Sequence, residues 1–340
     1  MIRAGIVGVS GYSGGETLKL LLNHPQVRVT YVSANNTQGP VDTLWPSLKG
    51  RTNLICHTYD PAKAVDQCDL VFLAVPHTVA MRVAPDLLKN KKKVIDLSAD
   101  YRLTSVDAYL NWYGQAHTDT EHLSTAVYGL CELFREKIRT AELIANPGCY
   151  PTGSLLGLLP LVSTDTENIE SIIIDAKSGV SGAGKKLAEG LMFAQVNENF
   201  KAYKVLNHQH TPEIEQILSQ VASRELSVSF VPHLLPVTRG ILSTIYVRCV
   251  RTPKLDAMTD VYNKFYKTEP FVRVLPSGDQ PELRTVNHTN YCDIALAVNE
   301  QQNLVVITTA IDNLMKGAAG QAVQNMNIMC RFPEKTGFQL

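Results

Sequence analysis

The sequence predicts an α/β protein with two domains: a Rossmann-type domain with a doubly wound parallel sheet, and an α+β domain with a mostly antiparallel sheet. Three observations support this prediction. The chain has 340 residues, a length typical of about two domains. Apolar runs alternate with amphipathic helical patterns up to about residue 150. Beyond about residue 165, the apolar runs follow one another with few helical patterns between them.

Short apolar runs in the first part of the chain predict strands buried on both faces, as in a parallel sheet. They occupy residues 4–9, 27–33, 70–75, 93–97 and 143–146. Between them, residues 13–23 and 78–88 place leucines, valines and alanines on one side of a helix. Alternation of this kind is typical of a doubly wound fold.

The second part of the chain predicts a different sheet. Its strand candidates are residues 171–176, 228–231, 241–250, 271–275, 293–298 and 304–310. Because few helices separate these runs, most neighbouring strands should be antiparallel. A last helix, predicted from about Asp312, has an apolar stripe that consists of Met315, Ala318, Ala319, Ala322, Val323 and Met326.

The composition excludes several classes of protein. Lys and Arg together number 32, as do Asp and Glu, so the charge balance indicates no surface for nucleic acid or an anionic membrane. The seven cysteines are irregularly spaced and include no C-x-x-C pair, which argues against a metal site or a disulfide framework. The sequence shows no secretory segment and no apolar stretch of the roughly 20 residues that span a bilayer. We therefore expect a cytoplasmic protein without a metal.

The first apolar run leads into a glycine-rich turn with the spacing G-x-x-G-x-x-G. Such a turn lets the backbone approach a pyrophosphate, and the following helix supplies N–H groups. Ser13 and Glu16 also fit a capping box at the start of this helix. The alternative is a tight turn without a ligand. The predicted cofactor-binding residues of the turn are Gly8, Ser10, Gly11, Tyr12, Ser13 and Gly14.

The end of the second predicted strand indicates which dinucleotide binds. An acidic residue there would accept a hydrogen bond from the ribose 2′-hydroxyl of NAD. Residues 33–37 instead read Ser-Ala-Asn-Asn-Thr, which offers hydrogen-bond donors and no carboxylate to repel a 2′-phosphate. The sequence thus predicts NADP(H), with Ser33 and Asn35 at the ribose.

Residues 179–186 approximate a P-loop, but Lys186 stands where a serine or threonine would bind Mg²⁺. We therefore do not expect ATP hydrolysis. A glycine loop with a lysine can still cradle a smaller anion, which makes Ser181 and Lys185 candidates for substrate binding. The alternative is a flexible loop with an exposed lysine.

Cys149 is the candidate nucleophile. It follows a short strand and a Pro147-Gly148 turn, and it begins an apolar helix. The positive end of a helix dipole favours the thiolate, and N–H groups there can hold an oxyanion. The six other cysteines lie in or beside ordinary strand and helix patterns, and we interpret them as packing residues or bystanders.

A nucleophilic cysteine usually needs a partner for proton transfer. His208 and His210 precede a helix predicted from Pro212, and either could be that partner. The alternative is a structural or metal-binding pair. A metal site would need a further ligand close in sequence, and none is evident.

The run from Ala145 to Gly153, which reads Ala-Asn-Pro-Gly-Cys-Tyr-Pro-Thr-Gly, resembles the N-acetyl-gamma-glutamyl-phosphate reductases of arginine biosynthesis. Residues 8–16, 96–102, 208–216 and 232–240 agree in the same order, so the resemblance spans nearly the whole chain. Related aspartate-semialdehyde dehydrogenases share the architecture but have a different cysteine motif. The resemblance implies NADPH-dependent reduction of N-acetyl-glutamyl 5-phosphate to N-acetyl-glutamate 5-semialdehyde, with release of phosphate.

The resemblance also implies roles for particular residues. Cys149 would form a thioester with the substrate, and His210 would donate and accept protons, with His208 as the alternative. Arg102 and Arg239 would hold the substrate carboxylate or phosphate through forked hydrogen bonds. Each arginine could instead form a surface or structural ion pair.

The family's last helix returns to the nucleotide domain, which would place Asn313 and Gly317 near the nicotinamide. The implied cofactor-binding domain then comprises residues 1–148 and 313–340, and the catalytic and dimerisation domain comprises residues 149–312. We expect a homo-oligomer, a dimer or a tetramer. The rival hypotheses are another acyl-phosphate reductase, a nucleotide-sensing protein that lost its chemistry, and a cysteine acyltransferase or hydrolase.

Overall fold

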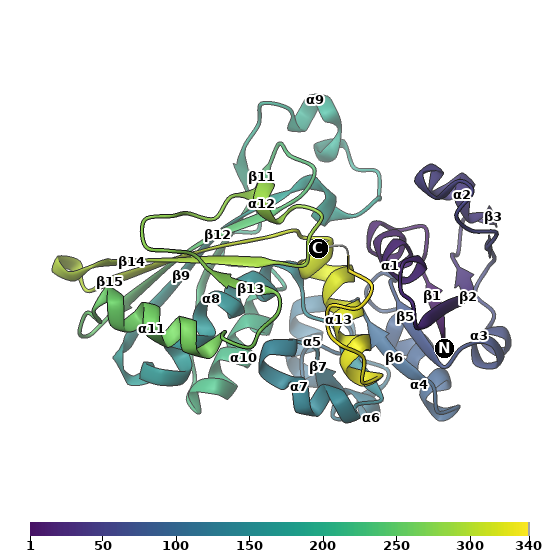
Figure 1. The fold of residues 1–340 in the computed structure, drawn as a ribbon, viewed down its shortest axis with the longest axis horizontal. Helices are drawn as coiled ribbons and strands as arrows, with labels where there is room; N and C mark the ends of the chain where they lie inside the picture. The colour runs from purple at the N-terminus through teal and green to yellow at the C-terminus, as the bar shows by residue number, and fades with distance from the viewer. Residues whose placement is uncertain (339–340) are drawn as a thin grey trace. The chain divides into compact units, whose positions relative to one another are not determined.

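The computed structural model describes residues 1–338 and divides into two compact units (Figure 1). The first unit consists of Met1–Pro147 and Ala318–Leu340, and the second consists of Gly148–Gly317. The sequence places the domain borders after residues 148 and 312, whereas the compact units divide after residues 147 and 317. Residues 339 and 340 of the predicted segment 313–340 lie outside the described residues.

A parallel sheet of six strands forms the centre of the first unit, in the order β2-β1-β5-β6-β8-β7. Every strand pair in it is parallel, which confirms the predicted Rossmann-type fold. All five predicted strands are present, and β7 is an additional strand of two residues. The strands are β1 (Ile2–Val7), β2 (Val27–Ser33), β5 (Leu70–Leu73), β6 (Lys93–Asp96), β7 (Val127–Tyr128) and β8 (Leu143–Ala145).

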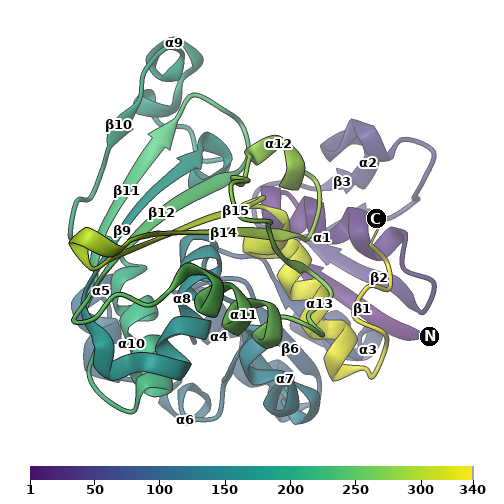
Figure 2. The ribbon, with the colours of Figure 1, turned by 60° about the vertical axis from the view of Figure 1, so that its left-hand side comes forward.

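In the described part of the chain, eight α-helices belong to the first unit together with this sheet. A short antiparallel pair of strands, β3 (Gly39–Pro40) and β4 (Ile55–Cys56), follows β2 in the chain. The helices are α1 (Tyr12–Leu22), α2 (Val41–Leu44), α3 (Pro61–Gln67), α4 (Ala80–Lys89), α5 (Val106–Tyr113), α6 (Thr120–Leu123), α7 (Cys131–Thr140) and α13 (Gly320–Met329). Although α13 comes from the end of the chain, it packs against α1, α7 and β6 (Figures 1 and 2). Its return to the first unit makes this unit discontinuous in sequence.

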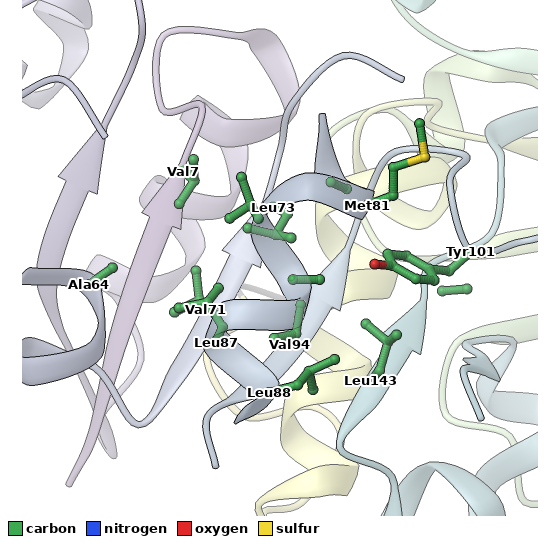
Figure 3. Packing of buried hydrophobic residues seen from close by; sticks show 14 of the residues in the cluster. Val7, Ala64, Val71, Leu73, Met81, Leu87, Leu88, Val94, Tyr101 and Leu143 are labelled. Carbon is green, nitrogen blue, oxygen red and sulfur yellow. The ribbon is translucent and has the colours of Figure 1, made fainter. Parts of the chain in front are cut away.

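One cluster of apolar side chains holds α4 against the sheet. Leu87 and Leu88 of α4 lie over Val71 and Val94, which belong to β5 and β6 (Figure 3). All four side chains are buried. Burying a side chain of this size stabilises the fold by about 1.5–3 kcal/mol, so these contacts hold α4 firmly against β5 and β6.

The second unit has a sheet of seven strands in the order β10-β11-β9-β12-β15-β14-β13. Only β9 with β11 and β13 with β14 pair in parallel, which confirms the predicted mostly antiparallel sheet. The strands are β9 (Ile169–Gly179), β10 (Lys201–Ala202), β11 (Ser229–Leu235), β12 (Ile241–Cys249), β13 (Val272–Val274), β14 (Cys292–Asn299) and β15 (Leu304–Ile311).

The helix α8 (Cys149–Asp165) packs on one face of this sheet, against β9, β12 and β15, and α10 (Thr211–Ala222) and α11 (Leu255–Phe265) pack beside it (Figure 2). Glycine allows the close approach, because a Cβ atom on Gly157 would lie 2.8 Å from Cγ2 of Thr309. The short helices are α9 (Phe193–Val196) and α12 (Leu283–Val286). The single-turn segments are η1 (Pro46–Leu48), η2 (Thr166–Asn168), η3 (Val180–Ala183), η4 (Glu189–Leu191), η5 (Glu300–Gln302) and η6 (Met315–Ala319), of which η6 is a π-helix.

The opposite face of the second sheet is more open. Along β12, Ile241, Ser243, Ile245 and Val247 are buried, whereas Leu242, Thr244 and Tyr246 between them are half-buried. This alternation is what the two-residue period of a strand produces when helices cover one face. Within residues 1–338, none of the helices combines the length and apolar character that crossing a membrane requires.

Candidate active site

The glycine-rich turn lies at the carboxyl end of β1. Gly8 has a φ of +96°, and its N–H donates to the carbonyl of Ser33 at 2.7 Å. A Cβ atom on Gly8 would lie 2.1 Å from the carbonyl oxygen of Ala74, and one on Gly14 would lie 2.3 Å from that of Gly8. At Gly11 the nearest such atom is 3.6 Å away. The first and third glycines are thus required by packing within the protein, and only the middle one leaves space open.

The predicted capping box is wrong. Helix α1 begins at Tyr12 with Gly11 as its N-cap, and no side chain caps it. The chain enters the helix too early for Ser13 to be the cap, and Glu16 instead forms an ion pair with Lys19 at 2.9 Å. Because the first turn of α1 contains no acidic residue, no side chain there offsets the positive end of the helix dipole, which can stabilise a bound anion. The uncapped start of α1, next to Ser10 and Tyr12, is therefore suited to an anion such as a pyrophosphate.

The predicted ribose site follows β2. Ser33 is fully buried, and its carbonyl accepts hydrogen bonds from both Gly8 and Val9, so Ser33 anchors the turn. Asn35 and Asn36 are exposed. The residues at this strand end therefore fit a dinucleotide, and the nearest exposed side chains carry amides and no negative charge.

Arg102 is buried in the first unit. Its Nε donates to the carbonyl of Asn146 at 2.8 Å, and its Nη2 donates to the carbonyl of Leu97 at 3.0 Å. These two carbonyls follow β8 and β6, so the guanidinium joins two strand ends. The guanidinium of Arg102, which is predicted to bind substrate, thus also has a structural role.

Cys149 is the first residue of α8, and Gly148 is the N-cap. The Cys149 side chain is half-buried, whereas Cys56, Cys68, Cys131, Cys249 and Cys292 are buried. Burial raises the pKa of the Cys68 thiol to about 11. Cys330 is also half-buried, but it caps the carboxyl end of α13, where the helix dipole opposes a thiolate. Among the seven cysteines, position and accessibility together favour Cys149 as the nucleophile.

Gly317 lies directly behind the nucleophile. A Cβ atom at this position would be 2.8 Å from the Cβ of Cys149 and 3.2 Å from its Cα. Gly317 is also part of the π-helix η6, and helical irregularities of this kind are frequent at functional sites. The sequence predicts that Gly317 contacts the nicotinamide. Within the second unit, the structure shows that Gly317 contacts the candidate nucleophile Cys149.

The two histidines lie in a cluster of aromatic rings. His208 is buried, with its ring centroid 4.7 Å from that of His210, and the Tyr150 ring contacts both. The backbone N–H of His210 donates to Nδ1 of His208 at 3.1 Å, so this nitrogen carries no proton. Burial, together with the nearby charge of Lys204, lowers the pKa of His208 to about 4. His208 is therefore neutral near pH 7, whereas His210 is half-buried and forms the N-cap of α10.

Glu213 is a site residue that the sequence did not indicate. Its side chain is fully buried, and its Oε1 accepts the N–H of Gly148 at 2.8 Å. The bond joins the start of α10 to the start of α8. Position three of a helix is a common place for a glutamate. The contact could not be seen in the sequence, because the two partners are 65 positions apart.

A second group of predicted residues meets where β9 and β15 end and β12 begins. Asn313 donates to Oγ of Ser181 at 2.9 Å and accepts the N–H of Gly240 at 2.8 Å. Arg239 forms an ion pair with the fully buried Asp312 at 3.2 Å. Ser181, Arg239 and Asn313 are thus brought together, whereas Lys185 is exposed. The side chain of Asn313 therefore connects the loop at Ser181 to the loop at Gly240. The predicted contact of Asn313 with the nicotinamide did not include this structural role.

Comparison with known proteins decides the family. Residues 3–141 match the model of the semialdehyde dehydrogenase NAD binding domain, and residues 149–313 match that of the semialdehyde dehydrogenase dimerisation domain. The chain is 49% identical to N-acetyl-gamma-glutamyl-phosphate reductase of Desulfotalea psychrophila, covering 100% of this chain and 99% of the relative. The chain belongs to the N-acetyl-gamma-glutamyl-phosphate reductase family. A relative of that name from Pelotomaculum thermopropionicum is 48% identical and covers 99% of this chain and 97% of its own length.

These matches confirm the resemblance predicted from the residues around Cys149, and they place the chain in a family of oxidoreductases. The first unit is accordingly an NAD(P)-binding domain. Solved structures show the shared fold. Aspartate semialdehyde dehydrogenase II of Vibrio cholerae, complexed with ASA, has a TM-score of 0.74 at 15% identity and covers 97% of this chain and 98% of its own. The Candida albicans enzyme with NADP has a TM-score of 0.72 at 15% identity, with the same coverage.

Proposed function

We propose that this protein catalyses the NADPH-dependent reduction of N-acetyl-glutamyl 5-phosphate to N-acetyl-glutamate 5-semialdehyde with release of phosphate, a step of arginine biosynthesis in the cytoplasm. The observation that carries the proposal is Cys149 at the N-terminus of α8, followed by Tyr150, whose ring contacts both members of a histidine pair. Relatives of the proposed activity align with the whole chain.

In the proposed reaction, the Cys149 thiolate attacks the acyl carbonyl of the substrate. The oxyanion that forms lies at the N-terminus of α8, where the first N–H groups belong to Cys149 and Tyr150 and Pro151 has none. Breakage of the C–O bond to phosphate then leaves a thioester on Cys149. This replaces one difficult displacement with two easier steps. NADPH, when bound, supplies the hydride that reduces the thioester carbon.

His210 is the proposed proton donor and acceptor, and His208 positions it. Because Nδ1 of His208 accepts the backbone N–H of His210, His208 fixes the residue that follows it by two positions. A group with a pKa of about 4 is also poorly matched to proton transfer near pH 7. A well-placed acid/base contributes on the order of 10²–10⁴-fold to the rate. On collapse of the thiohemiacetal, His210 returns the proton to the departing thiolate.

The substrate's anionic groups are assigned to the loops around Asn313. Arg239 is held by Asp312 and lies next to Gly240, whose N–H is bonded to Asn313. Together with Ser181 and Lys185 it forms the proposed site for the carboxylate or the phosphate. Arg102 is proposed for the other anionic group.

The cofactor is proposed to be NADP(H) in preference to NAD(H). The turn from Gly8 to Gly14 would hold the pyrophosphate at the uncapped start of α1. Asn35 would donate to the 2′-phosphate, and no carboxylate follows β2 to repel it. Asn313 and Gly317 are the proposed contacts to the nicotinamide. Fluorescence titration should give a lower dissociation constant for NADPH than for NADH, and equal values would contradict the preference.

The protein is also proposed to form a homo-oligomer, a dimer or a tetramer. The family model of the second unit is that of a dimerisation domain. In support, one face of the seven-stranded sheet is open, and the segment around α9 exposes large apolar side chains, with Leu187 97% and Phe193 81% exposed. Large apolar side chains that are exposed within one short segment are a common feature of interfaces. Light scattering on the purified protein should give the mass of two or four chains, and a monomer would contradict the proposal.

The decisive test is the reverse reaction. With N-acetyl-glutamate 5-semialdehyde, phosphate and NADP⁺, the protein should produce NADPH, and Cys149→Ser should abolish the turnover. Aspartate 4-semialdehyde in the same assay separates this activity from that of another acyl-phosphate reductase. Unchanged turnover by Cys149→Ser would refute the covalent mechanism, and a preference for the aspartate substrate would refute the proposed substrate.

A further inference from the structure

Glu213 is a fully buried carboxylate that the proposed mechanism does not use. It accepts the N–H of Gly148, which is the N-cap of α8 and directly precedes Cys149. Glu213 is itself the third residue of α10, whose N-cap is His210. One side chain therefore connects the residue before the nucleophile to the helix that begins next to the acid/base.

The backbone of Gly148 is held at both its N–H and its carbonyl. Its carbonyl accepts the N–H of Thr152 at 3.0 Å and Oγ1 of the same residue at 2.9 Å. Its N–H is held by Glu213, and α8 receives no side-chain cap from its N-cap residue. Because Gly148 has no side chain of its own, these bonds fix where the chain enters α8. They thereby fix the Cα position of Cys149.

A charged acceptor at this place is physically reasonable. Burying a carboxylate is costly unless hydrogen bonds and positive charges compensate for the lost water. Glu213 lies where two helices begin, and the positive ends of both dipoles stabilise it. A charge-assisted hydrogen bond is also stronger and shorter than a neutral one, so it holds the amide more rigidly.

We propose that Glu213 is a positioning residue that sets the geometry between Cys149 and His210. The inference rests on the proposed function and deepens it, because it assigns to α10 the task of placing both the proton-transfer group and the nucleophile.

Two uncharged variants isolate the hydrogen bond. Glu213→Gln keeps an oxygen that can accept the Gly148 N–H, whereas Glu213→Ala removes it, and neither carries a charge. We expect kcat of Glu213→Gln to stay within about tenfold of the wild type, and kcat of Glu213→Ala to fall about 100-fold below that of Gln, the effect of a misplacement of about 1 Å. The Michaelis constant for NADP⁺ should stay unchanged.

The pH dependence of Cys149 alkylation gives a second readout. The intact enzyme is reacted with iodoacetamide and then digested, and peptide mass spectrometry measures the modification of Cys149. The rate of this modification reports the thiolate form of Cys149. The midpoint for Glu213→Ala should lie at higher pH than that for Glu213→Gln, because the displaced thiolate loses its place at the helix N-terminus. This measurement needs no substrate. If the wild type fails to reduce NADP⁺ in the semialdehyde assay, the proposed function is wrong, and the alkylation profiles still decide the role of Glu213.

Glu215 supplies a matched control on the same helix. Its Oε1 accepts the backbone N–H of Val228 at 2.9 Å, so Glu215→Ala removes the same kind of bond away from Cys149. This variant should keep the wild-type kcat and alkylation midpoint. Equal kcat and midpoints for the Gln and Ala variants of Glu213, or the same losses in Glu215→Ala, would overturn the proposal. If Glu213→Ala does not fold, Glu213→Asp replaces it, because the shorter carboxylate keeps the charge and withdraws the acceptor. Wild-type behaviour of that variant would also overturn the proposal.

Discussion

Replacing Gly317 by alanine should inactivate the enzyme by displacing its nucleophile. The added Cβ atom would lie 2.8 Å from the Cβ of Cys149, 3.2 Å from its Cα and 3.4 Å from the carbonyl oxygen of Asp312. Carbon atoms in contact normally stay about 3.5–4.0 Å apart, so the two residues must separate by about 1 Å. Overpacking of this kind costs about 1–3 kcal/mol of stability. A shift of about 1 Å at a reacting group can lower the rate about 100-fold.

The assay separates this effect from one on the cofactor. We expect Gly317→Ala to lower kcat of the reverse reaction about 100-fold and to slow alkylation of Cys149 in the absence of NADPH, because the displaced nucleophile does not depend on the cofactor. Gly190→Ala is the control, because the nearest atom to its added Cβ is the flexible Nζ of Lys201 at 3.8 Å. Full kcat in Gly317→Ala would refute the packing argument. Weaker NADPH binding with normal alkylation of Cys149 would show that Gly317 acts only at the proposed nicotinamide contact and does not position Cys149.

Three further predictions concern the cofactor and pH. Asn35→Asp should lower the preference for NADPH over NADH about tenfold in steady-state assays, because a carboxylate would repel the 2′-phosphate; an unchanged ratio would place the phosphate elsewhere. Gly8→Ala should unfold or strongly destabilise the first unit, because its Cβ would lie 2.1 Å from the Ala74 carbonyl oxygen, whereas Gly11→Ala should fold with a similar melting temperature and bind NADPH more weakly. Equal melting temperatures for both glycine variants would argue against the described turn. Finally, the unfolded chain protonates His208 near pH 6.5 and the folded protein near pH 4. Because the unfolded state then binds more protons, stability should fall by about 3 kcal/mol as the pH drops through that window. His208→Gln should flatten this slope in denaturant melts, and an equally steep slope would show that other groups cause it.

Most of the fold could be predicted from the sequence, because apolar periodicity reports burial directly. Every predicted strand of both sheets is present, with ends displaced by a few residues. The strands that escaped prediction, such as β7 at Val127–Tyr128 and β10 at Lys201–Ala202, are two residues long and have no period to detect. Their pairing depends on neighbours distant in the chain.

The predictions that failed or needed revision depended on where a helix begins and on what packs against it. The capping box of Ser13 and Glu16 has the right residues, but α1 starts at Tyr12, so neither side chain reaches a cap position. The nicotinamide contact of Gly317 stays a prediction, and the structure adds a packing contact with Cys149 that the sequence did not indicate. Both depend on the path of the backbone and on packing in three dimensions, which a pattern of residue types does not encode.

By itself, the sequence determined the class of both sheets, the glycine turn, the choice of Cys149 and the family. These follow from local properties, namely apolar period, backbone freedom and a motif of nine consecutive residues. Only the tertiary structure distinguished His208 from His210, because the low pKa of His208 comes from burial by segments such as Tyr150 and Phe230 that are distant in sequence. It also revealed Glu213, whose contact with Gly148 spans 65 residues. Burial and hydrogen bonding between distant segments exist only after folding, and they control the chemistry of these side chains.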